Sequence, residues 1–233
     1  MVCNVITADK ANRLYWLGRY AERVYISLHL LRRYYDKVID GDIADLHEYY
    51  CNLGVETLGE DLESELFQLS QLYSPTNSCS IYSSLCGAND NAIVLRRDIT
   101  SESLSYIQMS LSIITECGVR GEKNITLLQS ITDYMLAFFG SIDERVFDKR
   151  IRKFLKAGRF IENIDLHIRF HYPFFRIEEV FVSLKDALRK AGIVVDEYSM
   201  EQLERLLTEE NYAPESEAYR TTVLGYLSSL VLV

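Results

Sequence analysis

The sequence has little proline and little glycine: 3 and 11 of them in 233 residues. Both residues interrupt helices, so their scarcity predicts long helices joined by short connections. The longest stretch with a strand-like alternation is 192–196, which we expect to form a short extended link. No linker rich in Gly, Ser or Pro divides the chain. We therefore expect an all-α fold, a single-domain helical bundle over residues 1–233.

Basic residues are also in deficit, with 25 Lys and Arg against 34 Asp and Glu, a net charge of -9. This balance argues against a nucleic-acid partner, because phosphate neutralisation needs a basic face. No apolar run approaches the roughly 18 to 20 residues that cross a bilayer, and residues 1–10 lack a signal pattern. Five scattered cysteines without a C-x-x-C pair are typical of reduced thiols. We expect a cytoplasmic protein without a membrane partner.

The common catalytic motifs are missing as well. The G-x-S-x-G elbow, the Walker A loop and the G-x-G-x-x-G loop are all absent, as is any Glu-x-x-His pair for a di-iron centre. His167 and His171 have the i, i+4 spacing of metal ligands, but a simple helix-end pair is the favoured interpretation. His29 and His47 are isolated and are interpreted as structural. We expect no metal and no cofactor.

What the sequence does contain is helical periodicity along most of its length. Thr7 or Asp9 is expected to cap the first helix and Gly41 to end it, Ser78 to cap the fourth, and Pro173 to end the seventh. Residues 173–233 are expected to pack on the bundle, although the apolar C-terminus is also suited to docking a partner. Helices are predicted over about 10–40, 42–53, 60–73, 80–97, 101–117, 124–139, 143–171, 177–191, 199–209 and 215–230.

Two of these helices, the long ones over 10–40 and 143–171, share an internal repeat with an offset of 140 residues. Leu14-Tyr-Trp-Leu-Gly-Arg-Tyr-Ala-Glu-Arg-Val24 aligns with Phe154-Leu-Lys-Ala-Gly-Arg-Phe-Ile-Glu-Asn-Ile164. The two copies share a pattern of Leu or Phe, Gly-Arg, an aromatic residue and Glu. We therefore expect these helices to be the two related central elements of the bundle.

The glycines of the repeat predict a close helix crossing. A glycine in mid-helix costs about 1 kcal/mol relative to alanine, and close approach of another backbone offsets that cost. We infer that Gly18-Arg19 and Gly158-Arg159 face each other near a pseudo-two-fold axis. The first helix is apolar nearly all round, so its charged residues need partners.

The charges of the repeat allow two interpretations. Arg19, Glu22, Arg159 and Glu162 form a structural salt-bridge core in the first. In the second, the arginines with Arg23 clamp a carboxylate or phosphate, and the glutamates orient their guanidinium groups. The basic run over 145–159 is separately expected to be a solvated face, with docking of an acidic partner or a nucleotide as the alternative.

The repeat resembles the Alpha-E family, a bacterial all-α domain. The most specific match is Asn12-Arg-Leu-Tyr-Trp-Leu-Gly-Arg-Tyr-Ala-Glu-Arg23, followed by residues 154–162. Weaker matches are Thr132-Asp133-Tyr-Met135 and residues 80–102, whose Asn91, Ala92, Arg96 and Glu102 resemble an E-N-A-R-x-x-R-D pattern. The resemblance is clearest over 8–172. Departures from the family pattern, which thin out the cationic residues, are Asn163 in place of Arg, Asp90 in place of Glu and Ile93 in place of Arg.

The resemblance implies a role in peptide or amide-bond chemistry. Members of the family are encoded beside, or fused to, circularly permuted ATP-grasp ligases and transglutaminase-like proteins. It thus predicts an accessory or binding protein that acts with an ATP-grasp-type ligase or another operon-encoded partner. One alternative is an enzyme that uses Glu22 or Glu162 as acid or base, and another is a purely structural interaction module. The candidate ligand-binding residues are Arg19, Glu22, Arg23, Asn91, Arg96, Arg159 and Glu162.

Overall fold

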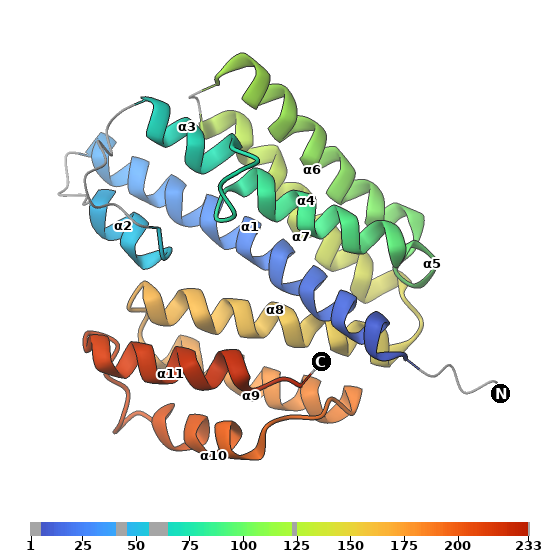
Figure 1. Cartoon of the computed structure of the whole chain (residues 1–233), viewed down its shortest axis with the longest axis vertical. Helices are drawn as coiled ribbons and strands as arrows, with labels where there is room; N and C mark the ends of the chain where they lie inside the picture. Colours follow the sequence, from blue (N-terminus) through green and yellow to red (C-terminus); the bar gives the residue numbers. More distant parts are fainter. Residues whose placement is uncertain (1–5, 41–45, 56–64, 123–124, 233) are drawn as a thin grey trace. The chain divides into compact units, whose positions relative to one another are not determined.

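The structure is a computed structural model that describes residues 6–40, 46–55, 65–122 and 125–232. Within these ranges every named element is helical, which confirms the all-α expectation (Figure 1). The elements are α1 (Ala8–Asp40), α2 (Leu46–Asn52), α3 (Glu65–Tyr73), α4 (Ile81–Val94), α5 (Arg96–Ile99), α6 (Ser101–Arg120), the 3-10 helix η1 (Ile125–Leu128), α7 (Gln129–Arg145), α8 (Lys149–Arg169), α9 (Phe174–Ala191), α10 (Glu197–Leu206) and α11 (Glu217–Ser229).

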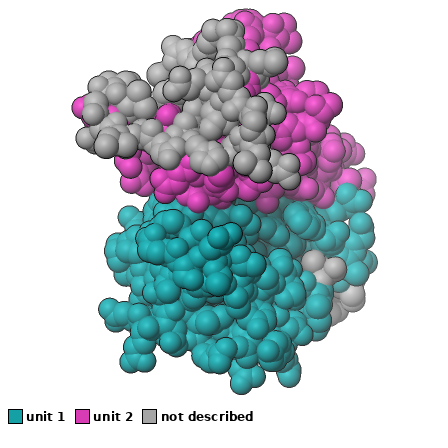
Figure 2. Space-filling view, turned by 60° about the vertical axis from the view of Figure 1, so that its left-hand side comes forward, with its two compact units in different colours: residues 1–19, 147–233 teal, residues 20–146 magenta. Residues whose placement is uncertain are grey.

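The chain divides into two compact units (Figure 2). The first unit comprises residues 1–19 and 147–233, and the second comprises residues 20–146. Helix α1 contributes its first turns to the first unit and the rest to the second. The expectation of a single domain over the whole chain stays a prediction.

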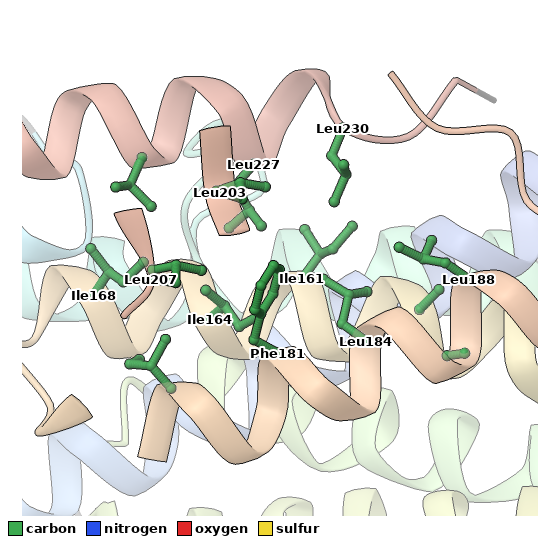
Figure 3. Packing of buried hydrophobic residues seen from close by; sticks show 14 of the residues in the cluster. Ile161, Ile164, Ile168, Phe181, Leu184, Leu188, Leu203, Leu207, Leu227 and Leu230 are labelled. Carbon is green, nitrogen blue, oxygen red and sulfur yellow. The ribbon is translucent and has the colours of Figure 1, made fainter. Parts of the chain in front are cut away.

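The core of the first unit lies among α8, α9, α10 and α11. Helix α9 packs along α8, while α11 packs on both α8 and α10. Their apolar side chains point toward one another (Figure 3), and each buried side chain of this size stabilises the fold by about 1.5–3 kcal/mol. Val223, Leu227 and Leu230 of the C-terminal segment are buried there, so this segment packs within the first unit.

The extended link predicted over 192–196 is also confirmed. Val195 forms an isolated antiparallel bridge with Val231. The N–H of Asp196 donates to the carbonyl of Leu230 at 2.9 Å, and the N–H of Leu232 donates to the carbonyl of Val194 at 3.2 Å. This pairing ties the end of the described chain to the loop that precedes α10.

The second unit is built on α6, which packs against α4 and α7, with α3 on α4 and α6. The part of α1 in this unit buries Ala21, Val24, Leu28 and Leu31, as the helical periodicity predicts. Its contacts include an edge-to-face pair of Tyr25 with Phe139 on α7.

The observed helix ends agree with some of the predicted caps and differ from others. Thr7 accepts a bond from the N–H of Lys10 and so caps α1 as predicted. The prediction of Ser78 as a cap is wrong: Ser80 precedes α4 and accepts from the N–H of Ser83 at 3.0 Å. The helix predicted over 80–97 is divided at Leu95 into α4 and α5. The predicted stop at residue 41 lies outside the described residues.

The long helix predicted over 143–171 begins later than expected. Asp143 belongs to α7, and α8 begins after Asp148, whose carboxylate accepts bonds from the N–H groups of Arg150 and Ile151. A capping carboxylate satisfies N–H groups that have no partner inside the helix, which explains the start at this point. The break at Pro173 is confirmed, since α8 ends at Arg169 and Pro173 directly precedes α9.

Candidate functional site: the Gly-Arg helix crossing

Within the first unit, the glycines of the repeat bring two backbones into direct contact. A Cβ atom added to Gly18 would lie 2.1 Å from the carbonyl oxygen of Leu155, and one added to Gly158 would lie 1.9 Å from that of Tyr15. Both distances are far below van der Waals contact, and the obstacles are backbone atoms that cannot turn aside. The predicted close crossing of α1 and α8 is therefore confirmed.

This crossing places the arginine of the first copy against the glutamate of the second. Arg19 Nε donates to Glu162 Oε2 at 2.7 Å. The Glu162 side chain is 1% exposed and the Arg19 side chain 13% exposed, so the pair is nearly dry. The Arg19 guanidinium also lies over the Trp16 ring, 5.0 Å from its centroid, and 5.9 Å from that of Tyr15. Carboxylate and ring faces together surround the cation.

The electrostatics of the pair keep Arg19 charged. Burial acts most strongly and lowers the pKa of Arg19, but Glu162, Tyr15 and Asp165 together raise the pKa above its ordinary value. Burial raises the pKa of the Tyr15 phenol, although the Arg19 cation acts in the opposite direction. Arg19 is thus paired inside the fold with the carboxylate of Glu162, and the expectation that the cluster holds a ligand stays a prediction.

A second carboxylate follows one turn later on α8. Asp165 has its pKa raised by burial, with the Arg169 cation lowering it and the Glu162 carboxylate raising it. Asp165 also accepts a bond from Arg169 Nε. The inner face of α8 thus carries two carboxylates, each paired with an arginine.

The other candidates from the repeat are divided between the units. Glu22 and Arg23 belong to the second unit, where Glu22 is fully buried and Arg23 is half-buried. Arg159 belongs to the first unit and is half-buried. The expectation that Glu22 joins Arg159 in a four-charge cluster stays a prediction.

Asn91 and Arg96 lie on neighbouring short segments of the second unit. The Asn91 side chain donates to the carbonyl of Gly87 at 2.8 Å, one turn earlier in α4. Arg96 is exposed on α5. One side-chain N–H group of Asn91 is thus bonded within its own helix, whereas Arg96 faces solvent. The roles of both residues in ligand binding stay predictions.

The basic run over 145–159 has a mixed environment. Lys149 and Arg150 are exposed, as expected for a solvated face. Lys153 instead reaches Asp186 on α9 at 2.8 Å, and the bonds from Lys153 and Lys190 lower the pKa of Asp186. Part of the run therefore joins α8 to α9.

The two histidines at the end of α8 have different surroundings. His167 stacks on Tyr172 with ring centroids 4.2 Å apart, and burial followed by the charge of Arg176 lowers its pKa to about 4. His171, which follows the helix, places Nδ1 3.1 Å from Glu215. Among the residues that the structure describes, no group of three or more His, Cys, Asp or Glu side chains is arranged to hold a metal ion.

A hollow of about 670 Å³ on the first unit lies away from the repeat residues. Its lining consists of Pro173, Phe174, Phe175, Glu178, Leu207, Thr208 and Glu209. Arg19 and Glu162 are thus not part of the lining of this hollow.

In the described part of the chain, no helix is both long enough and apolar enough to span a bilayer.

These features define an all-α protein organised around a repeated Gly-Arg helix. The chain belongs to the Alpha-E family, described as a predicted alpha-helical domain with a conserved ER motif, whose model matches residues 8–223. Glu22-Arg23 in the first copy of the repeat has this dipeptide, whereas the second copy has Glu162-Asn163. No curated protein and no solved structure matches the chain.

Substituting the crossing glycine tests the role of the backbone contact. We expect Gly158→Ala to lower the free energy of unfolding by about 1–3 kcal/mol or more, because the methyl group meets a carbonyl oxygen. Gly225→Ala on α11 is the matched control: its Cβ would meet nothing within 4 Å. The control should raise the same free energy by about 0.5–1 kcal/mol through helix propensity. Urea denaturation measures both, and equal effects would contradict the crossing.

Because the ion pair is buried, replacing only one of its two partners should strongly lower the free energy of unfolding. Arg19→Met leaves the buried Glu162 carboxylate without its guanidinium, which should cost about 3–5 kcal/mol. The double variant Arg19→Met/Glu162→Leu should recover much of that loss in a denaturation series. Arg13→Met, which removes an exposed pair with Asp9 on the same helix, should cost under about 0.5 kcal/mol. Additive effects of the two single substitutions would show that the pair is not coupled.

His167 predicts a loss of stability in mild acid. Its pKa falls from 6.5 in the unfolded chain to about 4 in the folded one, so the unfolded state takes up the proton first. The stabilisation by neutral His167 is complete above pH 6.5 and is lost as the pH falls toward 4. At pH 5 the free energy of unfolding should therefore be lower by up to about 2 kcal/mol. Urea denaturation at pH 7.5 and pH 5 measures this change. His167→Gln should remove it, and an unchanged pH dependence would refute the assignment.

Proposed function

We propose that this protein is an accessory or binding protein that acts with an ATP-grasp-type ligase in peptide or amide-bond synthesis or modification. The chain belongs to the Alpha-E family, and the association with such ligases that the family resemblance implies supports this role. The five scattered cysteines, which are typical of reduced thiols, support the proposed location in the bacterial cytoplasm. The partner is expected to be encoded beside this chain.

The observation that carries the proposal is that the Arg19 guanidinium already has its partners inside the protein. Its guanidinium is paired with Glu162 and covered by Trp16, with 13% of the side chain exposed. An acid or base must come within hydrogen-bond reach of a substrate, and Glu162 is 1% exposed. The geometry therefore favours a structural role for this pair over a catalytic one. Recognition of a partner is then expected from surfaces outside the crossing.

The experiment is reconstitution with the ligase. The full chain is co-purified with the ATP-grasp-type ligase encoded beside it, and ATP-dependent amide formation is measured with and without the chain. We expect the two proteins to form a complex in which the ligase is faster than alone. A chain that forms or cleaves amide bonds by itself would favour the enzyme alternative. A ligase whose rate and substrate range are unaffected would overturn the proposal.

A carboxylate variant separates the accessory role from the enzyme role. Glu162→Gln keeps the shape of the side chain but removes its charge, so stability should fall while the fold is retained. We expect ligase stimulation to scale with the fraction of folded chain, measured by circular dichroism on the same samples. Glu204→Gln, at an exposed ion pair on α10, is the matched control. Complete loss of activity in a fully folded Glu162→Gln protein would instead indicate catalysis by this carboxylate.

A further inference from the structure

The second unit contains a hollow that the family resemblance and the repeat do not account for. It has a volume of about 210 Å³ and lies between the later turns of α1 and the start of α7. The α1 wall is formed by residues at positions 28, 29, 32, 33 and 36, which share one helical face. The lining residues are Leu28, His29, Arg32, Arg33, Asp36, Leu128, Gln129 and Thr132.

The floor and the rim of this hollow differ in character. Leu28 and Leu128 are 3% and 1% exposed, so the floor is apolar and fully packed. Arg32 and Arg33 are exposed on the rim. A site with an apolar base and a few convergent polar groups is the usual form of a small-molecule pocket.

One of the rim arginines is held in place by a relay of hydrogen bonds. Arg32 Nη1 donates to Gln129 Oε1, and Gln129 Nε2 donates to Asp133 Oδ1 at 3.0 Å. The bond to Gln129 uses one of the five N–H groups of a guanidinium. The relay therefore orients the guanidinium of Arg32 while leaving donors for a ligand.

Two arginines line the described rim of the hollow although the chain carries -9 overall. Asp36 lies on the same rim, and Asp133 accepts a bond from Gln129 behind it. Gln129 and Thr132 stand in the first turn of α7, at the positive end of the helix dipole. The pKa of His29 is lowered first by burial and then by the charges of Arg33 and Arg32, so both cations act on the ring. His29 is also stacked on Tyr25, with an interplanar angle of 9°.

We propose that this hollow is a binding site for a phosphate group of a small molecule, held by the guanidinium groups of Arg32 and Arg33. Two adjacent guanidinium groups present paired N–H donors that match the oxygens of a phosphate. Thr132 and His29 supply a hydroxyl and a ring nitrogen at the same rim. The volume holds a phosphate with a small organic group attached, since one water occupies about 30 Å³. All the lining residues belong to the second unit, so the proposal is independent of the function proposed above.

Titration of the full chain with inorganic phosphate and pyrophosphate tests this site. Calorimetry at constant ionic strength gives the affinity, and the ring signals of His29 in NMR report its pKa. We expect saturable binding with a rise in the pKa of His29, because the bound anion, like the carboxylates of Asp36 and Asp133, offsets the charges of Arg32 and Arg33. Acetate at equal ionic strength is the anion control, and an equal response to acetate would overturn the assignment to phosphate.

Charge-removing variants locate the site. Arg33→Gln and Arg32→Gln should each weaken phosphate binding about tenfold or more, the usual loss for a charge-assisted hydrogen bond. Arg120→Gln is the matched control, an arginine of the same unit that is 73% exposed on α6. It should leave the affinity unchanged, and circular dichroism checks that each variant is folded. An equal loss in Arg120→Gln, or an unperturbed His29 signal at saturation, would refute the proposal.

Discussion

The contact between the α1 and α8 backbones at Gly18 and Gly158 is the constraint on which the rest of the first unit depends. Two carbonyl oxygens occupy the space where side chains would otherwise stand. Because the backbones approach so closely, Arg19, the residue after the first glycine, reaches Glu162, which lies one turn after the second. A wider crossing would lengthen this ion pair in a nearly dry setting, where an unpaired charge is most costly.

The ion pair specifies this arrangement more than it stabilises it. Removing two charges from water costs about as much as their attraction returns, so an apolar pair of similar size would stabilise the unit equally well. An apolar pair, however, tolerates sliding along the groove. The Arg19 guanidinium is satisfied where the Glu162 carboxylate and the Trp16 ring meet, and few registers provide both. The charges thus select one crossing among many that apolar packing alone would allow.

The helical fold and the close crossing of the two repeat helices were predictable from the sequence, but the choice of caps and the meeting of Arg32 with Gln129 were not. Mid-helix glycines are costly, so their occurrence in both repeats predicted the crossing correctly. The choice between Ser78 and Ser80, or between Asp143 and Asp148, was not predictable, because both members of each pair have the chemistry of a cap. The hollow beside His29 escaped prediction for another reason: Arg32 and Gln129, which meet at its rim, are 97 residues apart.

The contrast between Arg19 and Arg32 shows why a repeated arginine need not mark the place where a ligand binds. The field of Arg19 is cancelled nearby by Glu162, so an approaching anion gains little from it. At the described rim of the hollow, Arg32 and Arg33 lie near His29, whose pKa is lowered by burial and by these two cations. The arginine at the crossing is thus already paired inside the fold, whereas the arginines of the proposed phosphate site are exposed.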